Sequence, residues 1–303
     1  MSVRIRLARS AEDLDAVFRL RHRVFAEEEG IFGRQADGRV VDRFDAYPIT
    51  GIALAEIGGQ AVGTYRITEI TPVGTSTDEW YDFAPHLPAG TRAGAASLLA
   101  VEREFRERPG LVFSLLAMLY SWAASHGLTM LTAAVRPSVL ATATNHEWRT
   151  VGPQQVSSAH GLPFHPVVLR LEDLPDRFVR FFETHERPHL FDRFERGFFE
   201  PGEPVFATGD QADGAYVVID GTAEVIGEEG RIVATLTSGD IFGELALINA
   251  SPRTASVVAV TDLTVMIVER VAFSRAIETE PATAREVIRI LAERAASLLE
   301  PRS

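Results

Sequence analysis

Residues 242–258 read FGELALINASPRTASVV, an order of residues that suits a negatively charged sugar ligand. Gly243 has no side chain, so the backbone there can come close to a bound molecule. Glu244 supplies oxygen acceptors for sugar hydroxyl groups, and Arg253 offers a forked, charge-assisted hydrogen bond to phosphate oxygens. The apolar run after Glu244 can form a short helix, whose N-terminal amides favour an anion. A barrel corner with a surface arginine explains the same residues equally well when they are taken one by one.

The residues on either side of this stretch predict a small domain of antiparallel strands. From Phe198 onward, β-rich runs alternate with glycine-containing turns about every ten residues, as in GAYVVIDGTAEVIG (214–227). This rhythm is typical of a small barrel or jelly roll. We expect the domain to end in a helix over residues 280–299.

The whole pattern resembles the phosphate-binding cassette of cyclic nucleotide-binding domains. The resemblance rests on FGELAL (242–247), a short spacer, PRTA (252–255) and the lead-in PGEPVFATGDQADGAYVVIDGTAEV (201–225). It implies a jelly roll of about eight strands, Glu244 on the ribose 2′-hydroxyl, Arg253 on the cyclic phosphate and a C-terminal helix over the base. The binding residues that it implies are Phe242, Gly243, Glu244, Leu245, Ala246, Arg253, Thr254 and Ala255.

The identity of the base rests on one position of this cassette. Thr254 follows the arginine where members of the family often have alanine or serine for cAMP and threonine for cGMP. A hydroxyl group there can reach the phosphate or a guanine edge, so the position alone does not decide. We expect cAMP as an allosteric ligand, with cGMP as the alternative.

The first half of the chain predicts a different architecture, an α/β sandwich. Its order is a strand (3–7), a helix (11–27), a hairpin (51–70), a strand (95–106), an apolar helix (111–126) and further strands (128–135 and 167–171). The predicted fold class is therefore α+β with a mixed sheet in the first half. We expect an N-terminal domain over 1–172, a helical linker over 173–197 and the nucleotide-binding domain over 198–303.

Four spaced elements in this half resemble the acyl-homoserine-lactone synthases and the related N-acyl amino acid synthases. They are Arg21 with Phe25, DRFD (42–45), GTYR (63–66) and VEREF (101–105). These enzymes form a branch of the GNAT fold that takes acyl groups from carrier-protein thioesters. The Ser-Arg pair usual in the last element is missing here, and Ile31 replaces an expected tryptophan. S-adenosylmethionine is therefore not an expected substrate, and the donor stays open between an acyl carrier protein thioester and an acyl-CoA.

Candidate catalytic and substrate-binding residues follow from the chemistry of acyl transfer, which needs a neutral amine. Strand alternation over 95–106 predicts Glu102 and Glu104 on one face, where a partly buried carboxylate can accept the proton of the amine. Surface charges at a strand end explain both residues equally well. The predicted substrate-binding residues are Arg21, Phe25, Asp42, Asp45 and Arg66. The two acids can instead be surface residues, and the two arginines can pair with them structurally rather than bind a pantetheine phosphate.

Composition limits the remaining classes of function. The chain has 303 residues, no cysteine and a net charge of −12, and all 30 of its basic residues are arginine. Thiolate or lysine nucleophiles and cysteine–zinc sites are excluded, no metal site is predicted, and the charge does not favour nucleic acid. With no continuous run long enough for a membrane span, we expect a cytoplasmic protein. The sequence leaves its oligomeric state open.

These features favour a cyclic-nucleotide-regulated N-acyltransferase that acts on an amino acid or a protein lysine. Acyl carrier protein is an expected partner. The alternative is a non-catalytic nucleotide sensor whose acyltransferase-like half binds a partner.

Overall fold

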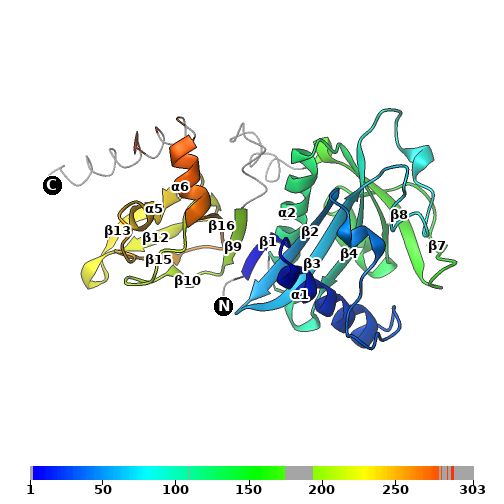
Figure 1. Ribbon diagram of the computed structural model, residues 1–303, viewed down its shortest axis with the longest axis horizontal. Helices are drawn as coiled ribbons and strands as arrows, with labels where there is room; N and C mark the ends of the chain where they lie inside the picture. The colour runs from blue at the N-terminus through cyan, green and yellow to red at the C-terminus, as the bar shows by residue number, and fades with distance from the viewer. Residues whose placement is uncertain are drawn as a thin grey trace. The chain divides into compact units, whose positions relative to one another are not determined.

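The computed structural model describes residues 3–108, 110–174 and 194–279, together with residues 281, 285, 288 and 289. Its contacts divide the chain into an N-terminal unit, Val3–Asp192, and a C-terminal unit that contains Arg193–Ser303 (Figure 1). Within the described ranges, no helix has the length and apolar character needed to cross a lipid bilayer.

The N-terminal unit is built on one mixed sheet with the strand order β1-β2-β3-β4-β5-β8-β6, in which β7 also pairs with β8. Every pairing between these strands is antiparallel except that of β4 with β5, which is parallel. The strands are β1 (Val3–Leu7), β2 (Thr50–Ile57), β3 (Gln60–Glu69), β4 (Ala93–Val101), β5 (Met130–Val135), β6 (Arg149–Thr150), β7 (Gln155–Val156) and β8 (Pro163–Arg170).

Two helices cover opposite faces of this sheet. Helix α2 (Leu111–Ser125) is apolar on nearly all sides and packs against β1, β2 and β3. It lies so close to β2 that a Cβ atom on Gly51 would be 2.5 Å from the ring of Trp122. Helix α1 (Ala11–Arg21) continues as a π-helical segment, His22–Glu28, and packs with Ile52 and Leu54. Because Ile52 and Leu54 alternate with Gly51 along the strand, the two helices lie on different faces.

Short helical turns and one short helix complete the unit. Helix α3 (Leu140–Thr144) follows β5. The turns are Arg43–Ala46, Ala84–His86, Arg103–Phe105, Pro137–Val139 and Leu171–Asp173.

One strand ends earlier than the sequence predicts. The prediction of a strand over 95–106 is wrong beyond Val101, and Arg103–Phe105 form a 3₁₀ turn. Val101 pairs with Gly63, and the Glu102 amide donates to the carbonyl of Val62, close to the start of β3 at Gln60. Strand β4 therefore ends at Val101, although β3 extends beyond Gly63 to Gln60, and strand alternation does not apply to Glu102 and Glu104.

The C-terminal unit consists of two four-stranded antiparallel sheets with the orders β14-β11-β16-β9 and β10-β15-β12-β13. Side chains from both sheets share one apolar core, which includes Tyr216, Phe242 and Leu263 from the first and Leu236 and Val257 from the second. The strands are β9 (Phe194–Phe199), β10 (Pro204–Phe206), β11 (Gly214–Asp220), β12 (Ala223–Ile226), β13 (Ile232–Leu236), β14 (Ile241–Phe242), β15 (Ser256–Ala259) and β16 (Leu263–Glu269).

Two helices belong to this unit, α5 (Glu244–Ile248) and α6 (Arg270–Thr279). The closing helix expected over 280–299 falls largely outside the described residues, and so does most of the linker expected over 173–197. Residues 194–197 of that linker lie in β9 rather than in a helix, because they pair with β16.

Candidate functional site

The N-terminal unit has a cavity of about 710 Å³. Strands β4 and β5 pair only from Ala93 to Ala95 with Met130 to Thr132. Beyond this pairing, Ser97 and Leu98 of β4 and Ala134 of β5 line the cavity. The cavity therefore opens where two parallel strands separate.

Strand β4 is irregular at the same point. Thr64 pairs with Ala100 but Arg66 pairs with Ser97, so the register shifts between them. Leu98 has a φ of 53°, a left-handed conformation that is rare for a residue with a side chain. A β-bulge leaves its extra residue outside the ladder and is common beside active sites. Backbone groups of β4 at Leu98 are thus turned out of the sheet at the cavity.

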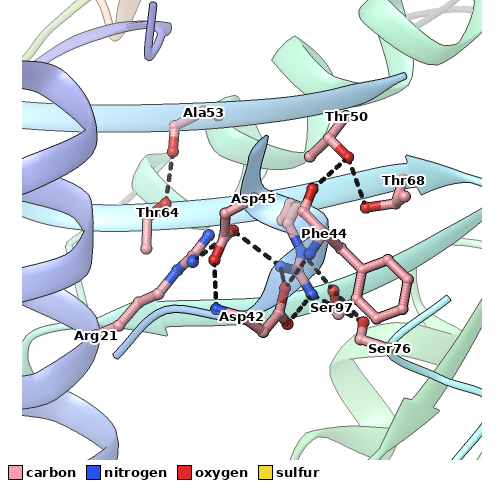
Figure 2. Close-up of polar contacts among 11 residues, drawn as sticks. Arg21, Asp42, Phe44, Asp45, Thr50, Ala53, Thr64, Thr68, Ser76 and Ser97 are labelled. Atoms are coloured by element: carbon pink, nitrogen blue, oxygen red, sulfur yellow. Dashed lines mark hydrogen bonds and ion pairs between the residues drawn. The ribbon is translucent and has the colours of Figure 1, made fainter. Parts of the chain in front are cut away.

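A charged network forms one wall of this cavity. Asp42 accepts from both terminal nitrogens of Arg66, at 2.7 and 2.8 Å, and Asp45 accepts from Nη1 at 2.8 Å. Ser76 accepts from Nη2 and Ser97 from Nε. Figure 2 shows Asp42, Asp45, Ser76 and Ser97 lying close together around these contacts. Since a guanidinium has five N–H donors, Arg66 has none left for a substrate anion.

The second arginine of the network lies deeper. Arg21 is fully buried and donates from Nη1 to Oδ1 of Asp45 at 2.8 Å (Figure 2). Burial lowers the pKa of Arg21, and Asp45 opposes that effect. Burial by itself would raise the pKa of Asp45, but the charges of Arg21 and Arg66 outweigh it and hold that pKa below its usual range. The structural pairing considered from the sequence is therefore the arrangement found.

The local backbone explains why both acids point at the arginines. Asp42 caps the turn Arg43–Ala46 by accepting from the Phe44 amide at 2.8 Å, and Asp45 accepts in return from the Asp42 amide at 2.9 Å. This reciprocal capping box fixes both side chains.

The predicted substrate-binding residues divide into two groups. Asp42 and Arg66 line the cavity. Arg21 and Asp45 lie behind them, and Phe25 is 6% exposed in the core beneath α1, so these three do not line it.

The predicted catalytic glutamates lie elsewhere. Glu102 accepts from Nε of Arg23 at 2.7 Å and from the side-chain Nε2 of Gln60 at 3.3 Å, and Glu104 is exposed on the 3₁₀ turn. Neither residue lines the cavity.

One cavity residue was missed from the sequence. The ring of His160 is tilted against that of Trp80 with centroids 4.9 Å apart, and it meets Phe32 edge-on at 5.8 Å. The three residues come from separate loops and all line the cavity. A single histidine in SSAHGLPF (157–164) gives no periodic signal, so only the fold reveals its position.

Three other histidines of the N-terminal unit, His22, His126 and His146, have structural partners. His22 accepts from the Gln35 amide at 3.1 Å. His126 and His146 each hydrogen bond through Nδ1 to a main-chain carbonyl four residues earlier, at 2.8 Å. None of these three lines the cavity.

The cassette of the C-terminal unit is organised around Arg253. Its side chain is 1% exposed. Nη1 donates to the carbonyl of Gly243 at 2.7 Å, and Nη2 donates to the carbonyl of Gly214 and to Oδ1 of Asp213, both at 2.8 Å. The guanidinium also lies over the ring of Phe206, 4.2 Å from its centroid. These contacts hold the guanidinium at the start of α5.

The remaining cassette residues have distinct positions. Gly243 has a φ of 76°, and a Cβ atom on it would be 2.8 Å from Nη1 of Arg253, so glycine is required there. Glu244 is 1% exposed. Phe242 and Ala246 are buried in the core, whereas Leu245 and Thr254 are exposed and Ala255 is half-buried.

Arg253 retains N–H donors for an anion, because its hydrogen bonds use three of the five N–H groups. Its Nε atom is buried and has no hydrogen-bond partner within the part of the chain that the structure describes. An unsatisfied buried N–H group is costly. The cassette thus fits an anionic ligand that would accept from this nitrogen.

Comparison with known proteins gives a match for each unit. Residues 196–280 match the family model of the cyclic nucleotide-binding domain, and residues 16–156 match that of N-acyl amino acid synthase FeeM. The structure of FeeM, an N-acyl amino acid synthase from uncultured soil microbes, is similar with 17% identity and a TM-score of 0.49, over 57% of this chain and 92% of that one.

Curated relatives match the C-terminal unit. The cAMP-dependent protein kinase regulatory subunit of Yarrowia lipolytica is 44% identical over 94 residues, which are 30% of this chain and 25% of that protein. The Cyclic AMP receptor protein of Thermus thermophilus is 31% identical over 105 residues, 33% of this chain and 49% of that protein. The chain thus spans about a quarter and about half of their lengths.

Both resemblances found in the sequence are confirmed at the level of the domain. The chain is a fusion of a C-terminal cyclic nucleotide-binding domain with an N-terminal domain of the N-acyl amino acid synthase FeeM type.

Proposed function

We propose that the chain transfers an acyl group from a thioester to an amine, and that a cyclic nucleotide regulates this transfer. The observation that supports it best is the cavity beside the bulge of β4, in a domain of the acyl amino acid synthase type. A cyclic nucleotide-binding domain follows in the same chain.

The cavity suits the donor. Its volume is within the range of small-molecule sites, about 300–1,000 Å³. Phe32, Val40, Phe44 and Leu98 give it an apolar part that can hold an acyl chain. The thioester carbonyl would lie at the bulge, where backbone N–H groups outside the ladder can stabilise negative charge on the carbonyl oxygen. An acyl carrier protein or CoA would supply this thioester.

We expect the acceptor to be an amine whose molecule also carries a negatively charged group close to the nitrogen. Arg43 lines the cavity, and its guanidinium lies over the ring of Phe44, 4.7 Å from the centroid. Among the residues that the structure describes, its N–H groups have no acceptor, so they could bind a carboxylate, unlike those of Arg66. This favours a free amino acid as the acceptor, with a protein lysine as the other candidate.

The nucleotide would bind at the cassette. The Arg253 guanidinium, whose Nε–H has no partner within the described residues, would hold the cyclic phosphate, and the carboxylate of Glu244 would accept from the ribose 2′-hydroxyl. We propose cAMP, with cGMP as the alternative. The other cassette residues, Phe242, Gly243, Leu245, Ala246, Thr254 and Ala255, would shape the backbone around the ligand.

Regulation has a physical route inside the C-terminal unit. Asp213 binds Arg253, and the carbonyl of Asp213 accepts from the amide of Arg270, the first residue of α6. Arg270 also donates from Nη2 to the carbonyl of Ala212 at 2.6 Å. A phosphate that draws Arg253 away from Asp213 would loosen the start of α6. Such a change shifts activity only if the nucleotide binds two states of the chain with different affinity.

The test is thiol release from palmitoyl-CoA and from a palmitoyl acyl carrier protein, with the twenty L-amino acids or a lysine peptide as acceptors. We expect turnover that changes when cAMP is added, and an amide product in mass spectra. The acyltransferase proposal would be abandoned if no pairing released thiol with or without nucleotide.

One observation favours a second candidate, a nucleotide sensor without catalytic activity. Glu102 is paired with Arg23 and Glu104 is exposed, and neither lines the cavity. If no other residue can accept the proton of the amine, the N-terminal unit would only bind an acyl ligand or a partner. The position of His160 bears directly on this point.

A further inference from the structure

His160 has the position and the chemical freedom of a proton acceptor in the cavity. Its ring contacts the rings of Trp80 and Phe32, and all three residues line the cavity. Its amide donates to Oγ of Ser157 at 3.2 Å, which fixes the backbone. Within the described ranges the two ring nitrogens have no hydrogen-bond partner. A neutral imidazole held in this way has a lone pair available to a bound amine.

The other ionisable groups of the cavity are less suited to this role. Asp42 is engaged by Arg66 and by the Phe44 amide. The carboxylate of Asp37 is 61% exposed and lies within 4.0 Å of Arg39. The arginines hold their protons throughout the accessible pH range. Glu79 lines the cavity but is exposed to solvent, whereas His160 is half-buried.

We infer that His160 is a catalytic residue that accepts a proton from the acceptor amine; this assignment rests on the proposed acyl transfer. An ammonium group enters the cavity and loses one proton to solvent. The neutral nitrogen then attacks the thioester carbonyl, and a C–N bond forms. His160 takes the second proton from nitrogen and gives it to the departing thiolate as the C–S bond breaks. The products are an amide and a free thiol, so atoms and charge balance.

Charged groups from every side of the cavity will influence this step. The acids are Asp37, Asp42 and Glu79, and the cations are Arg39, Arg43 and Arg66. Any pH profile therefore has to be compared between variants that leave these residues unchanged.

The most informative variant is His160→Phe, which keeps a ring against Trp80 but cannot accept a proton. General acid–base catalysis contributes about 10²- to 10⁴-fold, so we expect the rate of thiol release to fall at least about 100-fold. The KM for palmitoyl-CoA should stay the same, because the ring contacts are kept. The rate of the variant should rise with pH with a slope near one, because solvent hydroxide then has to remove the proton.

Two matched variants complete the experiment on the full-length chain. His146→Gln changes a histidine whose Nδ1 bonds to the carbonyl of Thr142 and which lies outside the cavity, so its turnover should equal that of the original chain. Glu79→Gln removes the charge of Glu79, an exposed acid that also lines the cavity. A loss of turnover in Glu79→Gln together with full activity in His160→Phe would overturn the assignment and transfer the role to Glu79.

The failure of this inference is distinguishable from that of the proposed function. If the unaltered chain turns over thioesters and His160→Phe does so at the same rate and with the same pH profile, only the role of His160 falls. If the unaltered chain releases no thiol from any donor, the acyltransferase proposal and the role of His160 fall together.

Discussion

Each unit of the chain buries an arginine beside an aspartate, but the two sites are completed differently. In the N-terminal unit, all five N–H groups of Arg66 donate to acceptors of the chain. One of these acceptors, Asp45, also accepts from Arg21. In the C-terminal unit, Arg253 binds two carbonyls and one carboxylate, that of Asp213, whose side chain is 46% exposed.

This difference separates structure from function. A network of two arginines and two aspartates is balanced in charge, and Arg66, its arginine at the cavity, has no donor left for a ligand. Arg21 keeps Nε and Nη2 without a partner among the described residues, but it does not line the cavity. Arg253 retains a buried Nε–H without a partner among the described residues, and its one counterion can be replaced from solvent. The first site is therefore expected to contribute mainly to stability, and the second mainly to ligand binding.

The largest effect is a loss of folding stability, expected when the network of Arg21, Arg66, Asp42 and Asp45 is broken. Asp45→Ala removes the partner of Arg21 and one partner of Arg66, and loss of one member of a buried ion pair costs about 3–5 kcal/mol. The tryptophans, Trp80, Trp122 and Trp148, all belong to the N-terminal unit, so urea unfolding followed by tryptophan fluorescence reports on that unit.

The control for this variant is Asp15→Ala. Asp15 pairs with Arg19 and Arg39 at the surface, where solvent screening leaves such pairs little effect on stability. Equal unfolding midpoints for Asp45→Ala and Asp15→Ala would contradict the structural role of the network.

The next largest effect is expected on nucleotide affinity at the cassette around Arg253. Arg253→Ala should weaken binding of cAMP at least about tenfold, because each hydrogen bond to a charged group contributes about 1.5–3 kcal/mol. Titration calorimetry of the full-length chain measures the affinity, and tryptophan fluorescence checks that the N-terminal unit is unchanged. Tight binding of cAMP by this variant would refute the cassette assignment.

Acid should destabilise the N-terminal unit through the same network. The pKa of Asp45 is held below its usual range in the folded chain, so the unfolded chain binds the proton first. The contribution of Asp45 is complete above its unfolded pKa of about 4 and is lost as the pH falls through the lower folded value. Urea midpoints measured between neutral and acidic pH should fall less steeply in Asp45→Asn than in the original chain. If the urea midpoints of both chains fell in parallel with pH, Asp45 would be excluded as the source of the acid destabilisation.

The smallest effect is expected at Thr254. A hydroxyl group there can add one hydrogen bond to the phosphate or to a guanine edge, which contributes about 0.5–1.5 kcal/mol. Thr254→Ala should therefore shift the ratio of cGMP to cAMP affinity toward cAMP by about two- to tenfold. An unchanged ratio in competitive titrations would show that Thr254 does not read the base.

Local patterns in the sequence were sufficient to predict the fold class and the cassette. Gly243, Glu244 and Arg253 lie close together in the chain, so one continuous stretch carries the resemblance to the phosphate-binding cassette. The hairpin of β2 and β3 and the apolar helix α2 were predicted for the same reason.

The cavity could not be predicted, since its residues come from distant segments. His160, Trp80 and Phe32 meet only through the fold. The glutamate prediction used strand alternation that requires β4 to continue past Val101, but Arg103–Phe105 form a 3₁₀ turn instead. Positions set by pairing partners far along the chain are not encoded in local periodicity.

The most direct test of the central claim measures thiol release by the full-length chain with and without saturating cAMP, in the original sequence and in Arg253→Ala. The account predicts that cAMP changes the rate of the original chain and that the rate of Arg253→Ala does not respond to cAMP. Equal rates with and without cAMP in the original chain, at a concentration where calorimetry shows the nucleotide bound, would contradict regulation by the C-terminal unit.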